Sequence, residues 1–295
     1  MGTKEAIGFV GLGIMGRAMA GNLLRAGFPL IVHNRTPSRT EELAAAGAVV
    51  AETPAALAAR CGIIVTMVSD TPDVESVIAG HNGILDGIRP RSLVIDMSTI
   101  SPDAEKKLAV RLRDRECDLV DAPVSGGDVG ARAGTLAIMA GGEQDSFARA
   151  KPLFEVMGKS VIHCGPVGSG QLTKLCNQIL VSITLLGVSE ALAFARRTGL
   201  DAKTMIEAVQ GGAAGSWQLQ NLGPRILDRD FDPGFMIDLM QKDLRLVLEE
   251  GARGGAALPA TALVHQLFRS AQSGRDGRSG TQALAKVLER LSDLD

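Results

Sequence analysis

One lysine within a largely apolar stretch of the sequence is the residue best suited to proton chemistry. Lys174 lies in the run 172–186, where most residues are apolar. Burying a lysine is costly unless it is paired or functional, and burial lowers its pKa, which suits a general acid or base near neutral pH. Asn177 follows three residues later, on the same face of a helix, where it could orient the ammonium group or hold a substrate hydroxyl. The pattern alone leaves open a lysine that reaches solvent along the helix surface.

A glycine pattern near the start of the sequence is typical of a dinucleotide site. The pattern G-x-G-x-x-G lies between an apolar run and an Ala/Leu-rich stretch. The first glycine allows a tight turn, the second lets the backbone approach a pyrophosphate, and the third lets helix and strand pack closely. The N-terminus of the following helix offers N–H groups to a phosphate. The residues predicted to bind the cofactor here are Gly11, Leu12, Gly13, Ile14, Met15 and Gly16.

The residues after the second predicted strand favour NADP(H). Domains that bind NAD usually place a carboxylate about 20 residues beyond the glycines. In this chain Asn34 takes that place and is followed by Arg35 and Thr36. A guanidinium and a hydroxyl suit a 2′-phosphate, which a carboxylate would repel. NADP(H) is therefore the favoured cofactor, with NAD(H) as the alternative.

Three further positions follow predicted strands. Ligands of a doubly wound sheet bind at the carboxyl ends of its strands, where we place Thr99 and the segment of Met67, Val68 and Ser69. The sequence Ser125, Gly126 and Gly127 also follows a strand. Bare N–H groups beside a hydroxyl could form an anion-binding concavity for a substrate carboxylate, although a simple turn would have the same composition.

The two halves of the sequence differ in pattern. The first alternates short apolar runs with helical patterns, and the second contains helical patterns alone. This order predicts an α/β domain with a doubly wound, mostly parallel sheet over 1–165, then an all-α domain over 166–295, joined by a long helix at about 170–197. The predicted strands are 7–10, 30–33, 63–68, 93–97, 119–122, 136–139 and 161–164. The other predicted helices are 38–46, 54–59, 102–114, 202–209, 218–227, 237–253, 259–273 and 281–291, and a mobile loop is expected at 273–280.

The composition excludes several classes of protein. The net charge is −2 and aromatic residues make up 3% of the 295 residues, which argues against nucleic-acid binding. The four scattered cysteines form no metal motif and indicate a reducing compartment, so we expect no metal and a cytoplasmic location. The apolar run at the start is broken by glycines, which argues against a secretion signal. No uninterrupted apolar run approaches the length of a membrane helix, so we expect no membrane association.

Four ordered motifs carry a resemblance to a known family. They are GFVGLGIMGRAMAGNLLRAG, DAPVSGGDVGARAGTLAIMAGG, GSGQLTKLCNQ and QKDLRLVLEEG, and they extend from residue 8 to residue 251. With these motifs the sequence resembles the β-hydroxyacid dehydrogenase family, which includes 3-hydroxyisobutyrate dehydrogenase and tartronate semialdehyde reductase (2-hydroxy-3-oxopropionate reductase). The wording of the second motif is most similar to the tartronate semialdehyde reductases.

The resemblance implies roles for the residues singled out above. Lys174 corresponds to the general acid/base of the family, and Asn177 would hold it in place. Ser125, Gly126 and Gly127 would bind the substrate carboxylate. Lys242 matches a lysine that approaches both nicotinamide and substrate. The segment 67–69 and Thr99 would contact the dinucleotide.

The resemblance also implies a reaction and leaves alternatives open. A small carboxylated aldehyde would be reduced to a β-hydroxyacid, with tartronate semialdehyde converted to D-glycerate as the favoured case and 3-hydroxyisobutyrate, succinic semialdehyde or glyoxylate as alternatives. An inactive dinucleotide-binding scaffold and an imine reductase are the rivals from other classes. The apolar long helix indicates a homodimer or homotetramer. The segment around Trp217 and the sequence Gly277-Arg278-Ser279-Gly280 depart from the family pattern, which leaves substrate choice and the C-terminal region open.

Overall fold

The structure, a computed structural model, describes residues 5–294 and divides into two compact units. The first ends at Lys174 and the second begins at Leu175, so the division falls within the long helix α9 (Ser169–Thr198). The sequence predicted a boundary nine residues earlier, before this helix. The difference arises because the first turns of α9 are hydrogen-bonded to the strands of the first unit, as described below.

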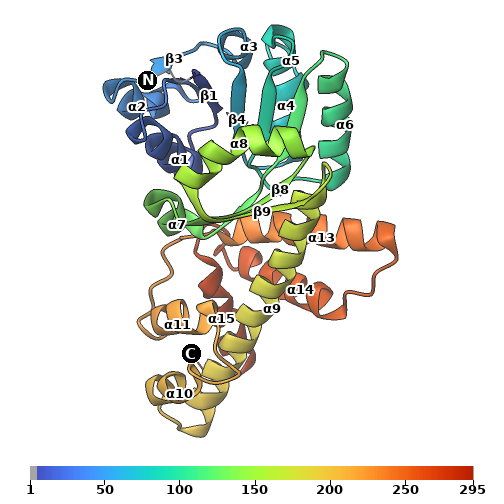
Figure 1. Cartoon of the computed structure of the whole chain (residues 1–295). Coiled ribbons are helices and arrows are strands. Elements are labelled where there is room, and N and C mark those ends of the chain that lie inside the picture. The colour runs from blue at the N-terminus through green and yellow to red at the C-terminus, as the bar shows by residue number, and fades with distance from the viewer. Residues whose placement is uncertain (1–4, 295) are drawn as a thin grey trace. The chain divides into compact units, whose positions relative to one another are not determined.

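The first unit is built on one sheet of nine strands, most of them parallel (Figure 1). Its order is β3-β2-β1-β4-β5-β6-β8-β7, with β9 paired to β8. The strands β1 to β6 all run parallel, whereas β8 is antiparallel to β6 and β7. The bounds are β1 (Ile7–Val10), β2 (Leu30–His33), β3 (Val49–Val50), β4 (Ile63–Thr66), β5 (Leu93–Asp96), β6 (Asp118–Asp121), β7 (Val124–Ser125), β8 (Leu136–Gly141) and β9 (Gly158–Gly165).

Helices cover both faces of this sheet, because the central strands are apolar on both sides. Phe9 and Val65 pack against α1, α7 and α8, while Val10 and Ile64 pack against α3 to α6. The predicted doubly wound architecture is therefore confirmed. The helices are α1 (Ile14–Arg25), η1 (Pro37–Thr40), α2 (Glu41–Ala45), α3 (Pro54–Ala58), α4 (Thr71–Ala79), α5 (Ile84–Gly87), α6 (Pro102–Arg113), α7 (Gly127–Ala133) and α8 (Gln144–Met157).

Several elements of this unit were not predicted from the sequence. They are the two-residue strands β3 and β7 and the helices α4, α5, α7 and α8. Strands of two residues are too short to show an alternating pattern. Asp70 caps the N-terminus of α4: its side chain accepts a hydrogen bond from Thr71 N, and a proline follows in the first turn. An acidic cap followed by a proline is a helix start signal that the sequence contains.

The second unit is helical and packs around α9 (Figure 1). Leu185 and Leu186 of α9 share one core with Met240 and Phe268. The further elements are α10 (Ala202–Val209), α11 (Trp217–Asn221), α12 (Gly223–Leu227), α13 (Ile237–Gly254), α14 (Pro259–Ser273), η2 (Thr281–Leu284) and α15 (Ala285–Leu291). The helix predicted at 218–227 is thus two short helices, and the helix predicted at 281–291 begins as a 3-10 turn.

Two features of the second half of the chain need comment. Helix α9 has 30 residues and an 18-residue window with a mean hydropathy of 1.7, so by length and composition alone it could cross a membrane. This window does not test the expectation about uninterrupted apolar runs, because average hydropathy tolerates scattered polar residues; half of the window is buried within the protein. The loop 273–280, expected to be mobile, is held by hydrogen bonds from Ile237 N to Ser279 O and from Asp238 N to Gly277 O.

Candidate active site

The glycine-rich turn between β1 and α1 has the geometry that its sequence predicts. Gly11 has φ of +97°, and a Cβ there would lie 2.3 Å from Met67 O. A Cβ on Gly16 would lie 2.0 Å from Gly11 O, so no larger residue fits between helix and strand. By contrast, a Cβ on Gly13 would meet nothing within 4 Å. Gly13 therefore borders open space at the N-terminus of a 12-residue helix, where a phosphate would fit.

The end of β2 is tied to this turn. Asn34 Oδ1 accepts a hydrogen bond of 2.8 Å from Leu12 N, and its Nδ2 donates to Thr36 O. Arg35 is exposed, and its guanidinium lies 3.3 Å from a carboxylate oxygen of Asp73. Asn34, Arg35 and Thr36 thus lie beside the glycine turn. The Arg35 guanidinium could bind a phosphate in place of the Asp73 carboxylate.

The ends of β4 and β5 are joined by a buried carboxylate that the sequence did not point out. Asp96 Oδ1 accepts hydrogen bonds from Thr66 Oγ1 at 2.6 Å and from Ser98 Oγ at 2.7 Å. Ser98 Oγ in turn accepts from Val68 N at 2.9 Å. The predicted cofactor segment at 67–69 is therefore fixed to the segment that contains Thr99.

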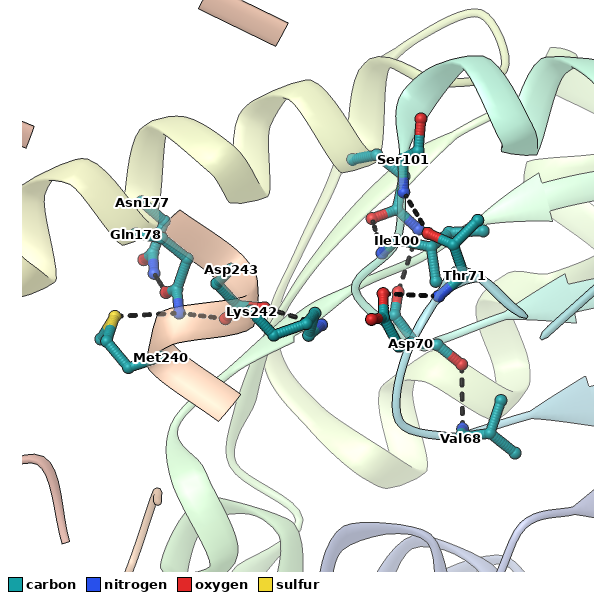
Figure 2. Close-up of polar contacts among 12 residues, drawn as sticks. Val68, Asp70, Thr71, Ile100, Ser101, Asn177, Gln178, Met240, Lys242 and Asp243 are labelled. Carbon is teal, nitrogen blue, oxygen red and sulfur yellow. Dashed lines mark hydrogen bonds and ion pairs between the residues drawn. The ribbon is translucent and has the colours of Figure 1, made fainter. Parts of the chain in front are cut away.

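Two further hydrogen bonds lie at the N-terminus of α4, next to the contacts of Ser98 and Val68 (Figure 2). Thr71 Oγ1 accepts from Ser101 N at 3.1 Å, and Asp70 Oδ1 accepts from Thr71 N at 2.7 Å. The first contact joins the start of α6 to the start of α4, and the second caps α4 itself. The two loops at the carboxyl edge of the sheet are thus held together by side chains rather than by strand pairing.

The predicted carboxylate-binding turn lies between β7 and α7. Ser125 is the last residue of β7, and it pairs with Ala137 of β8. Gly126 and Gly127 have φ of +132° and +61°, values that residues with a side chain rarely adopt. The turn therefore requires glycine at Gly126 and favours it at Gly127, and the Ser125 side chain is only partly buried.

Lys174 is buried, with 7% of its surface exposed, and the start of its helix is anchored on β6. Asp121 at the end of β6 accepts from Gly168 N at 2.7 Å and from Gln171 N at 2.8 Å, just ahead of Lys174. A Cβ on Gly170 would lie 2.3 Å from Met139 O, so the helix can approach the sheet this closely only with glycine there. Burial raises the pKa of Asp121 to about 7, against the two backbone hydrogen bonds, which favour its ionised form.

The helical unit has a polar cluster of its own (Figure 2). Gln178 is buried and donates from Nε2 to Asp243 Oδ2, while its Oε1 accepts from Asn177 Nδ2 at 2.7 Å. Lys242 Nζ lies 2.7 Å from the other oxygen of Asp243, an ion pair of sequence neighbours without good hydrogen-bond geometry. Asn177 and Lys242 are therefore bound to one cluster through Gln178 and Asp243.

Comparison with known proteins decides the family. Residues 6–165 match the model described as the NAD-binding domain of 6-phosphogluconate dehydrogenase, and residues 168–288 match the NAD-binding model of NADP-dependent 3-hydroxyisobutyrate dehydrogenase. The chain is 42% identical to 2-hydroxy-3-oxopropionate reductase of Escherichia coli, over 97% of this chain and 98% of the relative. The chain belongs to the β-hydroxyacid dehydrogenase family. It is an NAD(P)-dependent oxidoreductase.

Further relatives and solved structures agree with this result. A probable mitochondrial 3-hydroxyisobutyrate dehydrogenase-like protein of Arabidopsis thaliana is 43% identical over 99% of this chain and 87% of its own length. The Mycobacterium tuberculosis 3-hydroxyisobutyrate dehydrogenase, solved with L-serine, has a TM-score of 0.89 at 30% identity and covers 97% of this chain and 99% of its own. A further solved structure, Psf3, contains NADP⁺ and has a TM-score of 0.87 at 27% identity, with 96% and 99% of the two chains covered.

The dehydrogenase contains polar residues that the sequence analysis missed. Asp96, Glu105 and Gln171 are buried in the first unit, and Gln178 and Asp243 in the second. Asp121, Gln171, Gln178 and Asp243 all lie within the quoted motifs, so their presence was visible although their pairing was not. Asp96 had a weaker signal, a lone carboxylate at the end of an apolar strand.

Proposed function

We propose that this dehydrogenase reduces a small carboxylated aldehyde with NADPH, and that tartronate semialdehyde, giving D-glycerate, is its substrate. The observation that carries the proposal is the buried Lys174, placed one turn beyond the point where α9 is anchored at the carboxyl edge of the sheet. That edge is where a doubly wound sheet binds its ligand. The 42% identity to 2-hydroxy-3-oxopropionate reductase supports the choice of substrate.

Each proposed residue has a defined task in the reaction. When it is bound, the reduced nicotinamide supplies the hydride that reaches the carbonyl carbon. Lys174 as an ammonium group donates its proton to the carbonyl oxygen as negative charge develops there. The Ser125 hydroxyl and the N–H groups of Gly126 and Gly127 bind the substrate carboxylate and orient the carbonyl. Asn177 positions the ammonium group, and Lys242 adds a positive charge for the carboxylate.

A substrate panel with one variant tests this proposal. NADPH oxidation is measured with tartronate semialdehyde, succinic semialdehyde, methylmalonate semialdehyde, glyoxylate and a cyclic imine. We expect the highest kcat/KM with tartronate semialdehyde. Lys174→Ala is expected to lower turnover by about 10² to 10⁴-fold, the usual contribution of general acid catalysis, while NADPH still binds. Wild-type turnover in that variant would overturn the assignment of Lys174.

The same assay tests the cofactor preference. Arg35→Ala is expected to lower kcat/KM for NADPH by about tenfold or more, because a charge-assisted hydrogen bond contributes about 1.5–3 kcal/mol, and to change kcat/KM for NADH little. Asp73→Ala is the matched control, since it frees the guanidinium that Asp73 now holds. A wild type that prefers NADH, or equal losses with both cofactors, would contradict the preference for NADP(H).

Assembly and location remain part of the proposal. Leu180, Phe194 and Trp217 of the helical unit are each more than 60% exposed, and apolar side chains of this size favour a homodimer or homotetramer. Light scattering of the purified chain measures this directly. The reducing compartment indicated by the unpaired cysteines supports a cytoplasmic location.

A further inference from the structure

A buried group of carboxyls in the first unit has no task in the proposed reaction. Asp96 and Glu105 are both fully buried, and their carboxyl groups are close enough to share a hydrogen bond. Glu105 lies on α6, while Asp96 ends β5. Two carboxylates at this distance cannot both stay ionised in a buried site without a large electrostatic cost.

The pattern of hydrogen bonds shows where a shared proton would lie. Asp96 Oδ2 and Glu105 Oε1 are buried oxygens that no described N–H or O–H group reaches. A proton on one of them turns this contact into a donor and an acceptor. Asp96 Oδ1 already accepts three hydrogen bonds, from Thr66 and twice from Ser98, which stabilises its ionised form. Glu105 Oε2 accepts only from Gln171 Nε2 at 3.4 Å, so the proton belongs to Glu105.

Burial acts in the same direction. It is the largest cause that raises the pKa of Glu105 well above its ordinary value, and the negative charges of Asp96 and Asp121 add to it. A neutral Glu105 then donates to Asp96 and accepts from Gln171. Within residues 5–294 no group of three or more His, Cys, Asp or Glu side chains is placed to hold a metal ion.

Gln171 connects this pair to the helix that contains Lys174. Its Nε2 donates to Ser98 O at 2.9 Å, and its Oε1 accepts from Ile100 N at 3.1 Å. Its own N–H donates to Asp121. Lys174 follows three residues later, on the same face of the helix. A continuous chain of hydrogen bonds thus runs from Val68 N through Ser98, Asp96 and Glu105 to Gln171.

We propose that Glu105 is a positioning residue which, as a neutral carboxylic acid, joins Asp96 to Gln171 and holds Lys174 in register with the loops expected to contact the dinucleotide. This inference rests on the proposed role of Lys174. It assigns the protonated acid to one named oxygen, Oε1 of Glu105, and leaves Asp96 ionised. Displacement of a reacting group by about 1 Å can cost about 10²-fold in rate, so such a link can matter without touching substrate.

Two amide variants of the full-length protein test the position of the proton. Glu105→Gln replaces the acid by a group that donates and accepts in the same places, so we expect kcat within about threefold of wild type. In the proposal, both oxygens of Asp96 accept hydrogen bonds. Asp96→Asn replaces one of these acceptors by an NH₂ donor, and we expect kcat to fall by tenfold or more. Glu105→Ala is the reference for loss of the link, with a fall of about tenfold or more in kcat and a smaller change in the dissociation constant of NADPH.

Infrared spectroscopy provides a readout that does not depend on activity. A difference spectrum between the wild type and Glu105→Gln at neutral pH is expected to show the carbonyl stretch of a buried protonated carboxylic acid, because a contribution of Asp121, whose pKa is about 7, is common to both proteins and cancels. Absence of this band from the difference spectrum, or an equal loss of kcat in Glu105→Gln and Glu105→Ala, would overturn the inference. Full turnover in Lys174→Ala would instead refute the proposed function, whereas the infrared result would still decide whether Glu105 is protonated.

Discussion

Two buried glutamines lie seven residues apart on the same helix, and each contacts a buried carboxyl group. Gln171 belongs to the Rossmann unit, and its side chain bonds to Ser98, Ile100 and Glu105. Gln178 belongs to the helical unit, where it bonds to Asp243 and to its neighbour Asn177. The amide of Gln171 therefore joins three positions far from it in the sequence, whereas that of Gln178 joins Asp243 and makes a weak contact with Met240 Sδ at 4.0 Å.

The buried carboxyl groups around Gln171 (the first cluster) and around Gln178 (the second cluster) are stabilised by different kinds of partner. The partners of Asp96 and Asp121 are neutral: hydroxyl groups, backbone N–H groups and a carboxylic acid. The partners of Asp243 are an amide and the ammonium group of Lys242. Neutral donors can stabilise a buried charge only when many converge in fixed geometry, so the first cluster is expected to be the more rigid and the more sensitive to loss of one member.

The largest expected effect comes from removing each amide in turn. Gln171→Leu leaves Ile100 N and Ser98 O without their partners and takes the amide from Glu105. Because each buried unsatisfied group costs about 1–3 kcal/mol, we expect the free energy of unfolding to fall by about 3–5 kcal/mol. Gln178→Leu removes the bond to Asp243, which keeps Lys242 beside it, and the bond from the partly buried Asn177, so a fall of about 1–3 kcal/mol is expected. Urea unfolding followed by circular dichroism measures both.

Gln171→Leu and Gln178→Leu are matched controls for each other, because both make the same substitution on α9. Hydrogen exchange detected by mass spectrometry shows which segments lose stability. For Gln171→Leu, the segments at 98–101 and 168–174 are expected to exchange faster while α13 does not. Equal destabilisation by the two substitutions would contradict the difference between the clusters.

The same comparison shows which parts of the site a sequence can predict. The tight turn at Gly11 and the close packing at Gly16 were predicted correctly, because the motif acts through local backbone geometry. Most strands were predicted to within a few residues, since their apolar runs are buried on both faces. Lys174 was singled out because a charge in an apolar helix is conspicuous by itself.

The pairing of buried polar groups was beyond the sequence. Gln171 and Ile100 are 71 residues apart, and nothing in either segment indicates the other. Asp96 and Asp121 each end an apolar strand, where a carboxylate is as consistent with an exposed turn as with a buried acceptor. Such pairings depend on how the strands are ordered in the sheet, which single-residue patterns do not encode.

A smaller effect is expected from pH, and it separates the two clusters again. Burial raises the pKa of Asp121 to about 7 from an ordinary value of 3.8, and it raises that of Glu105 as well. Since the folded protein then binds more protons than the unfolded chain between pH 4 and 7, stability is greatest at low pH and falls as pH rises through this window. Between pH 5 and 7 we expect a loss of roughly 2 kcal/mol from Asp121.

Urea unfolding of variants at several pH values tests this dependence. Asp121→Asn is expected to be less stable than wild type at every pH, because an amide cannot accept from both Gly168 N and Gln171 N. Its stability should nevertheless change less between pH 5 and 7. Gln178→Leu alters only the cluster of the helical unit and should keep the wild-type slope. A slope that vanishes in Gln178→Leu and persists in Asp121→Asn would mean that the titrating carboxyl belongs to the other cluster.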